Sequence, residues 1–174
     1  MAEEDTSAVT GSLDWCGQSS ERRVAVRRLA LVVMLLNLTL VLRAADPVIG
    51  TWHLNLAKSR YDPGPAPKSQ TRIYREEGGG VKAVVITVYK NGNSDTVHYA
   101  VNYDGKEHPV DGSPDTDGIL MQRVNDYTAE SVLIHAGHTV GTARRTVSAD
   151  GQTMTITFKT PEVNNTASYD REKE

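Results

Sequence analysis

The sequence predicts an all-β fold, an antiparallel up-and-down barrel of about eight or nine strands, and three observations support this. The composition, with 14 glycines, one phenylalanine and many threonines and valines, favours short strands joined by tight turns. From Val48 onward, β-favouring stretches alternate with turn residues, and no window has a helical period. Consecutive hairpins leave exposed sheet edges, which closure into a barrel removes. A two-sheet β-sandwich is the alternative.

About nine β-favouring stretches follow one another along the chain. The first ends at a loop with three prolines, which cannot belong to a central strand. Asn91-Gly92 and Asp104-Gly105 are pairs that favour the positive φ angles of tight hairpins. The stretches cover residues 50–56, 70–76, 81–89, 96–103, 107–110, 119–124, 131–135, 138–147 and 153–158. We expect 107–110 to be a brief edge-like piece, and residues 166–171 are a candidate for the strand that closes the sheet.

One face of the predicted strands is apolar and the other is polar. Met154, Ile156 and Phe158 alternate with threonines, and Tyr99 lies on the apolar face of its own stretch. The apolar face must turn inward, so the barrel interior is expected to hold mainly branched aliphatic residues and tyrosines. These side chains leave space for a ligand whose polar head Tyr99 could orient.

The first forty-five residues have the pattern of an export signal. Residues 29–42 are a run of fourteen mostly apolar residues that follows four arginines and precedes Arg43, Ala44 and Ala45. A membrane helix needs about 20 apolar residues. We therefore predict that residues 1–45 are a tail plus signal peptide cleaved near Ala44 or Ala45, and that residues 46–174 form one secreted or periplasmic domain without a stable membrane span. An uncleaved signal anchor that tethers the domain to the membrane is the alternative. The acidic residues 1–21 also leave open a start codon assigned too early.

Charge and cysteine content exclude several classes of function. The net charge of -3 belongs entirely to residues 46–174, because five basic and five acidic residues precede Asp46. Nothing in that segment is basic enough to follow a phosphate backbone, so we expect no nucleic-acid partner. Cys16 is the only cysteine and precedes the apolar run, which excludes internal disulfides and thiolate metal sites from the predicted domain.

Four residues are candidates for a ligand site: Trp52, Tyr99, Arg144 and Arg145. The two arginines are neighbours on a strand and must point to opposite faces, so one of them could enter the barrel. A buried guanidinium needs a partner, either a ligand carboxylate or the ring of Trp52. We expect Trp52 to plug the closed end of the barrel, with one of the two arginines against it.

The sequence contains no recognisable catalytic motif, and we therefore predict that the protein is not an enzyme and has no cofactor. It has no nucleophile elbow, zinc-protease motif, phosphate loop or dinucleotide fingerprint. His135 and His138 flank a predicted two-residue hairpin and could approach one metal ion. Two ligands at an exposed turn make a weak site, so no metal centre is predicted.

Residues 48–54, Val-Ile-Gly-Thr-Trp-His-Leu, resemble the opening Gly-x-Trp strand of lipocalin-like (calycin-type) and fatty-acid-binding-protein-like barrels. Residues 48–171 also resemble a group of small exported bacterial proteins of no assigned activity. The resemblance implies a small antiparallel barrel. It does not extend to the helix pair or the terminal Arg-x-Tyr of fatty-acid-binding proteins, or to lipocalin disulfides. Only Gly50 and Trp52 are therefore carried over.

Two functions remain open. The first is an exported protein that binds a small apolar or amphipathic ligand, such as a lipid, inside the barrel. The alternative is a structural or protein-interaction barrel that is filled by its own side chains and acts through its loops. An interior cavity of roughly 300 Å³ or more would favour the first. The sequence does not indicate the oligomeric state.

Overall fold

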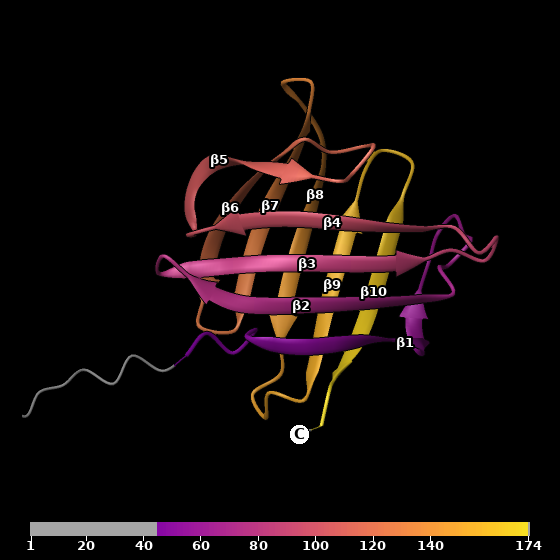
Figure 1. Cartoon of the computed structure of the whole chain (residues 1–174), viewed down its shortest axis with the longest axis horizontal. Helices are drawn as coiled ribbons and strands as arrows, with labels where there is room; N and C mark the ends of the chain where they lie inside the picture. The colour runs from indigo at the N-terminus through magenta and orange to yellow at the C-terminus, as the bar shows by residue number, and fades with distance from the viewer. Residues whose placement is uncertain (1–44, 174) are drawn as a thin grey trace, which may run out of the picture. The chain divides into compact units, whose positions relative to one another are not determined.

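The structure is a computed structural model that describes residues 45–173, and these residues form one closed antiparallel barrel of ten strands (Figure 1). Each strand pairs with its neighbours in sequence, and the first strand pairs with the last. The strands are β1 (Gly50–Arg60), β2 (Ser69–Glu77), β3 (Gly80–Val88), β4 (Ser94–Val101), β5 (Asp104–Asp111), β6 (Gly118–Asn125), β7 (Thr128–His135), β8 (His138–Val147), β9 (Thr153–Lys159) and β10 (Asn164–Arg171). The predicted all-β, up-and-down barrel is confirmed.

The strand count differs from the prediction of eight or nine. The brief edge-like piece expected at residues 107–110 is a full strand, β5, and it lies between β4 and β6. The candidate closing strand is also present as β10, which pairs with β1 and so leaves no edge. The first strand begins at Gly50, as expected, but it runs on to Arg60.

The wall of the barrel is weakest between β4 and β5. Their ladder contains only two residue pairs, His98 with Asp111 and Tyr99 with Val110. The N–H of Val110 donates to the carbonyl of Asp117 on the β6 side. Because successive backbone N–H groups alternate between the two sides of a strand, the nitrogen of Pro109 faces β4, where it has no hydrogen to donate. Proline is therefore tolerated in this internal strand because the neighbouring ladder is short.

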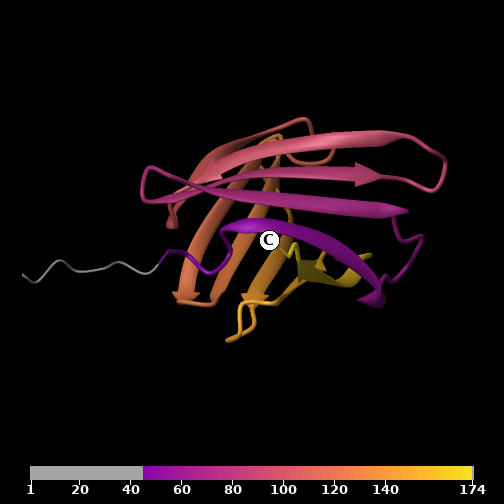
Figure 2. The ribbon, with the colours of Figure 1, turned by 60° about the horizontal axis from the view of Figure 1, so that its bottom comes forward.

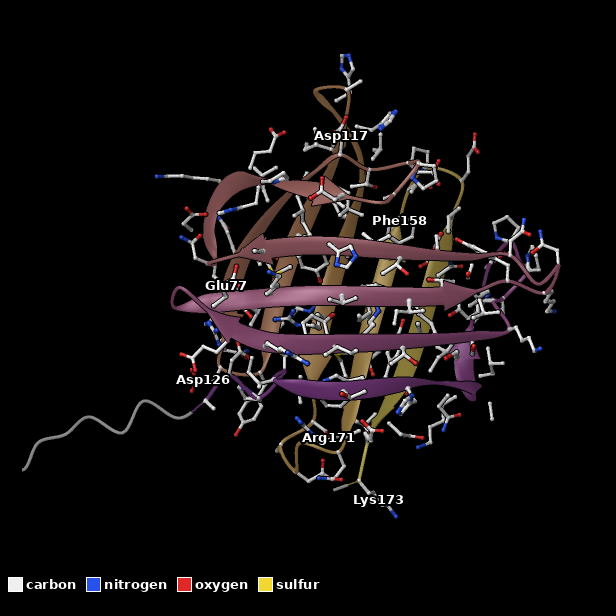
Figure 3. The ribbon with its side chains drawn as sticks, viewed as in Figure 1. Glu77, Asp117, Asp126, Phe158, Arg171 and Lys173 are labelled. Carbon is white, nitrogen blue, oxygen red and sulfur yellow. The ribbon has the colours of Figure 1, made fainter. Side chains whose placement is uncertain are left out.

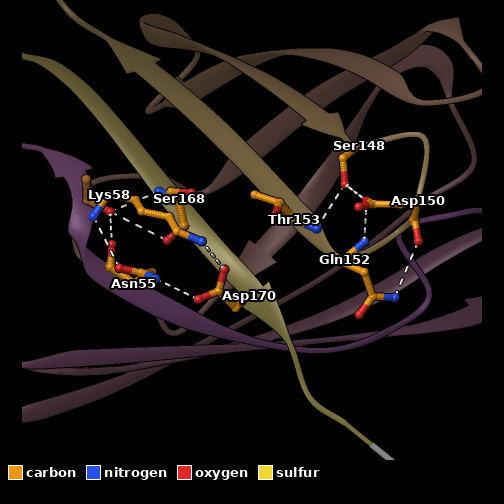
Figure 4. A network of polar contacts seen from close by, with 9 residues as sticks. Asn55, Lys58, Ser148, Asp150, Gln152, Thr153, Ser168 and Asp170 are labelled. Carbon is orange, nitrogen blue, oxygen red and sulfur yellow. Dashed lines mark hydrogen bonds and ion pairs between the residues drawn. The ribbon is translucent and has the colours of Figure 1, made fainter.

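The strands β1 to β4 run across the strands β6 to β10, so the barrel has two layers (Figures 1 and 2). Strand β1 belongs to both layers because it pairs with β2 near its start and with β10 along its length. A register shift against β10 lies between Asn55 and Arg60. There the Ser59 hydroxyl donates to the carbonyl of Asn55 (2.6 Å) and accepts from the N–H of Ser168 (2.9 Å). Asn55 and Ser168 are labelled in Figure 4. Such a bulge bends the strand, which helps the sheet to close.

The closed end of the barrel is plugged by Trp52. This side chain is 0% exposed, and its Nε1 donates to the carbonyl of Val48 (2.8 Å). The guanidinium of Arg171 lies over the ring, 4.2 Å from its centre, and donates to the carbonyl of Ile49 (2.6 Å). The predicted burial of Trp52 is confirmed.

The prediction that Arg144 or Arg145 lies against Trp52 is wrong. Arg171 takes that place because it is the direct partner of Trp52 in the β1–β10 ladder. Arg145 lies on β8, and its guanidinium contacts tyrosine rings instead.

Steric constraints explain why the first position of the Gly-x-Trp pattern is a glycine. Gly50 has a φ of +134°, and a Cβ atom at this position would lie 2.5 Å from Nη1 of Arg171. A larger residue would therefore be strained and would also displace the guanidinium from Trp52.

The predicted signal peptide and its cleavage near Ala44 or Ala45 fall on the first forty-five residues, of which all but Ala45 lie outside the described part of the chain. Residues 45–173 contain no helix that is long and apolar enough to cross a membrane.

Candidate functional site

The candidate site is a cavity of about 280 Å³ inside the barrel, between the Trp52 plug and the opposite, open end. Phe158 of its lining and Arg171 of the plug are labelled at opposite ends in Figure 3. The volume is close to the 300 Å³ that separates the two predicted functions. The apolar part of the lining comes from Val85, Val97, Val110, Ile119, Met121, Leu133, Ala143, Ile156 and Phe158.

Arg72 of β2 places the first positive charge in this cavity. Its Nε donates to Oε1 of Gln70 (3.0 Å) and to the hydroxyl of Tyr169 (3.1 Å), and Nη1 donates to the hydroxyl of Tyr74 (3.4 Å). Among the described residues, no carboxylate forms an ion pair with Arg72. Its charge is therefore solvated by neutral oxygens alone.

Arg145 of β8 places a second positive charge in the cavity. The residue is 8% exposed, and its Nη2 donates to the hydroxyl of Tyr103 (2.7 Å). Its guanidinium lies 5.2 Å from the ring centre of Tyr74 and 5.8 Å from that of Tyr103. Nη1 is buried and has no hydrogen-bond partner in the described part of the chain. The link from Arg145 to a carboxylate passes through Tyr103, whose hydroxyl donates to Oδ2 of Asp46 (2.6 Å).

The two guanidiniums make the deep part of the cavity favourable for negative charge. Burial acts to raise the pKa of Tyr74, but the charges of Arg72 and Arg145 and the hydrogen bonds from Tyr99 and Arg72 outweigh it, so the pKa is lowered. Burial raises the pKa of Tyr99, so this residue stays a neutral hydrogen-bonding phenol. The same two positive charges favour an anionic group of a ligand at this end of the cavity.

The mouth of the cavity has the opposite charge. Tyr89, Asp95 and Asp115 all line it. The Tyr89 hydroxyl donates to Oδ2 of Asp95 (2.6 Å), and this hydrogen bond, burial and the charges of the two carboxylates raise the pKa of Tyr89 to about 12. The cavity is therefore lined by aliphatic walls, with cationic groups deep inside and carboxylates at the entrance.

The structure separates the four predicted site residues. Tyr99 and Arg145 line the cavity together. Trp52 belongs to the plug at the closed end and is not among the lining residues. Arg144 points outward, where it forms an ion pair with Glu130 beside a concavity of about 630 Å³ on the outer face of β5 to β9. This outer concavity is larger, but its arginine already has a carboxylate partner.

Sequence reasoning missed the contribution of β2. Gln70, Arg72 and Tyr74 alternate along this strand and all point into the cavity. The period of two was visible in the sequence, but the apolar Ile73 lies in the opposite phase and suggests that the other face is the inner one. Polar residues inside a barrel invert the usual pattern, so no signal in this strand alone identifies the inward face.

The predicted histidine pair does not form part of a larger cluster. His135 and His138 are cross-strand partners at the β7–β8 hairpin, and Nδ1 of His135 lies 3.8 Å from Oδ2 of Asp117. Within residues 45–173, no group of three or more His, Cys, Asp or Glu side chains is placed to hold a metal ion.

Comparison with known proteins gives a likeness of fold. No family model matches the chain, and no curated protein matches it. Among solved structures, the fluorescent protein UnaG is similar, with a TM-score of 0.50, 15% identity and coverage of 72% of this chain and 97% of UnaG. A point mutant of UnaG gives a TM-score of 0.52 and 16% identity, and covers 74% of this chain and 99% of the mutant. The shared feature is the fold, a closed antiparallel β-barrel in this chain. At this identity the likeness establishes the fold and not the ligand.

Proposed function

We propose that this protein binds a small amphipathic molecule inside the barrel, with an anionic group of the ligand against Arg72 and Arg145. The observation that carries the proposal is Arg145: a guanidinium in a residue only 8% exposed lines the cavity, and one of its nitrogens has no partner among the described residues. The aliphatic wall of the same cavity would hold the apolar part of the ligand.

The energetic cost of this arrangement supports a binding role. Burying an unpaired cation costs several kcal/mol, and an apolar side chain of similar size would fill the same place at lower cost. A ligand carboxylate would supply the missing acceptor and recover much of this cost on binding. The alternative function, a filled barrel that acts through its loops, gives the unpartnered nitrogen of Arg145 no such role.

We also infer that the protein acts as a binding protein rather than an enzyme, and that it is exported. The lining of the cavity includes no histidine or cysteine, and its carboxylates, Asp95 and Asp115, lie at the mouth. Export is supported by the arginine-flanked apolar run at residues 29–42. N-terminal sequencing of protein recovered from its host tests this, and an intact Met1 on secreted protein would contradict cleavage.

The binding proposal is tested by displacement of an environment-sensitive apolar dye. A medium-chain carboxylate such as octanoate should bind about 10- to 100-fold more tightly than octanol, as measured by displacement of the dye. The reason is that a hydrogen bond to a charged partner contributes about 1.5–3 kcal/mol. Arg145→Met should reduce this difference, and Arg72 would account for what remains. Arg144→Met is the matched control, because this arginine is adjacent in sequence but lies on the outer face, and it should leave the difference unchanged. Absence of saturable dye binding, or equal displacement by acid and alcohol, would overturn the proposal.

A further inference from the structure

The carboxylate of Asp95 is incompletely satisfied at the mouth of the cavity. Asp95 lies near the start of β4, and its Oδ2 accepts the hydroxyl of Tyr89 (2.6 Å). Its other oxygen, Oδ1, is buried and has no hydrogen-bond partner in the part of the chain that the structure describes. No lysine or arginine of the described residues forms an ion pair with Asp95. The residue also lines the cavity, so a bound molecule can reach its side chain.

The polar neighbours of Asp95 are engaged elsewhere. Thr87 is its partner across the β3–β4 ladder, and the Thr87 hydroxyl accepts a hydrogen bond from Nε2 of Gln70 (2.8 Å). Gln70 in turn accepts from Arg72 and Tyr169 through Oε1. Gln70, Thr87 and Asp95 are cross-strand neighbours at the mouth, but these interactions supply no donor to Oδ1 of Asp95. A buried carboxylate oxygen without a donor is costly, as is the unpartnered nitrogen of Arg145.

The two unsatisfied atoms belong to opposite ends of one cavity. Asp95 and Tyr99 lie on the same face of β4, four residues apart, which corresponds to about 14 Å between their Cα atoms at 3.4 Å per residue. Tyr99 hydrogen-bonds to Tyr74, whose ring lies against Arg145. A negative group and a positive group of the protein therefore face the cavity at a separation that a short aliphatic chain can span.

We propose that the ligand is dipolar, with its anionic group at Arg72 and Arg145 and a cationic amine at Asp95. This inference rests on the proposed function and adds the chemistry of the other end of the ligand. A cationic amine is favoured over a neutral donor because Asp115 lines the same mouth and adds a second negative charge there. The ligand class is thus an amino carboxylate with an apolar spacer between its charged groups.

The test compares three series of probes of increasing chain length: ω-amino carboxylates, the parent carboxylates and the parent alkylamines. Affinities are measured by dye displacement and by isothermal titration calorimetry on the wild-type protein. At one chain length, the ω-amino carboxylate should bind about tenfold or more tightly than the parent carboxylate, because the amine reaches Asp95 only at a matching span. An amine that adds nothing at any length would overturn the inference, and this comparison requires no variant.

Asp95→Asn identifies the residue responsible. The amide keeps an acceptor for the Tyr89 hydroxyl but removes the charge, so the gain from the amine should disappear. The parent carboxylate should bind at least as tightly as to the wild type, because a repelling charge is removed from the mouth. Asp111→Asn removes the same charge from an exposed position at the end of β5 and should preserve the gain. Persistence of the gain in Asp95→Asn would also overturn the inference. Failure of all carboxylates to bind would instead overturn the proposed function, so the two failures are distinguishable.

Discussion

Replacing Arg145 with Met should leave the barrel as stable as the wild type or make it more stable. The substitution removes the bond from Nη2 to Tyr103, worth about 1.5–3 kcal/mol for a charged donor, and two ring contacts at 5.2 and 5.8 Å worth about 0.5–1 kcal/mol each. It also relieves the desolvation of a buried ion, several kcal/mol, and the unpartnered Nη1, about 1–3 kcal/mol. The expected net change lies between zero and about 3 kcal/mol in favour of Met.

The measurement is urea unfolding of the ligand-free protein at neutral pH, followed by circular dichroism. The urea concentration at the midpoint of unfolding should stay constant or rise. The dependence of the unfolding free energy on urea concentration should not change, because the same surface is exposed on unfolding. Arg171→Met is the contrasting variant. Its guanidinium lies over Trp52 and donates to the carbonyls of Pro47, Ile49 and Gly151, so its loss should cost about 3 kcal/mol or more.

A loss of more than about 2 kcal/mol in Arg145→Met would refute this reasoning. Arg145 would then be a structural residue like Arg171, and its unpartnered nitrogen would no longer support a ligand anion. Unchanged or higher stability together with reduced discrimination between acid and alcohol is the combination that a binding residue produces.

Three further predictions concern the closed end. Trp52→Ala should lower the free energy of unfolding by about 3–5 kcal/mol in urea titrations, and a loss below about 1 kcal/mol would show that the plug carries little packing. Gly50→Ala should cost about 1–3 kcal/mol through strain at φ +134°, whereas an unchanged midpoint would mean that Arg171 moves aside freely. Burial opposes ionisation of Asp46, but hydrogen bonds from Tyr103, the Val48 N–H and Arg123 prevail and lower its pKa. Its stabilising effect is therefore complete above about pH 4 and is lost as the pH falls through the folded-state pKa, so unfolding curves of wild type and Asp46→Asn should converge in acid. A difference in unfolding free energy between wild type and Asp46→Asn that is the same at all pH values would contradict this.

The fold was largely predictable because it depends on local chemistry. Asn91-Gly92 lies in the β3–β4 turn as predicted, and the alternation around Met154 and Ile156 specifies the inward face. The prediction for Asp104-Gly105 is wrong, because both residues belong to β5 and Asn102 and Tyr103 form the connection before it. A chain of consecutive hairpins then has few ways to bury that face. The alternation also predicted that Tyr99 lies on the apolar face of its stretch, and in the structure Tyr99 lines the cavity with Val97 while Val101 belongs to the core.

The site was less predictable because it depends on register across the closure. Arg171 lies against Trp52 only because β10 pairs with β1 at that residue, and no local pattern specifies which residues meet when a sheet closes. The inward position of Arg72 was also hard to predict, for a different reason. Its strand carries polar residues on the inner face, so a hydrophobic pattern points to Ile73 instead.

The short ladder between β4 and β5 gives this barrel a line of weakness in an otherwise continuous wall. Opening it breaks only the pairs of Tyr99 with Val110 and His98 with Asp111, whereas the next shortest ladders, β1–β2 and β5–β6, have four pairs each. Tyr99 and Val110 also line the cavity, so the same opening exposes the interior. Amide hydrogen exchange should therefore be fastest along this line. A bound molecule that touches both strands would slow that exchange, so exchange protection there reports how long the cavity stays occupied.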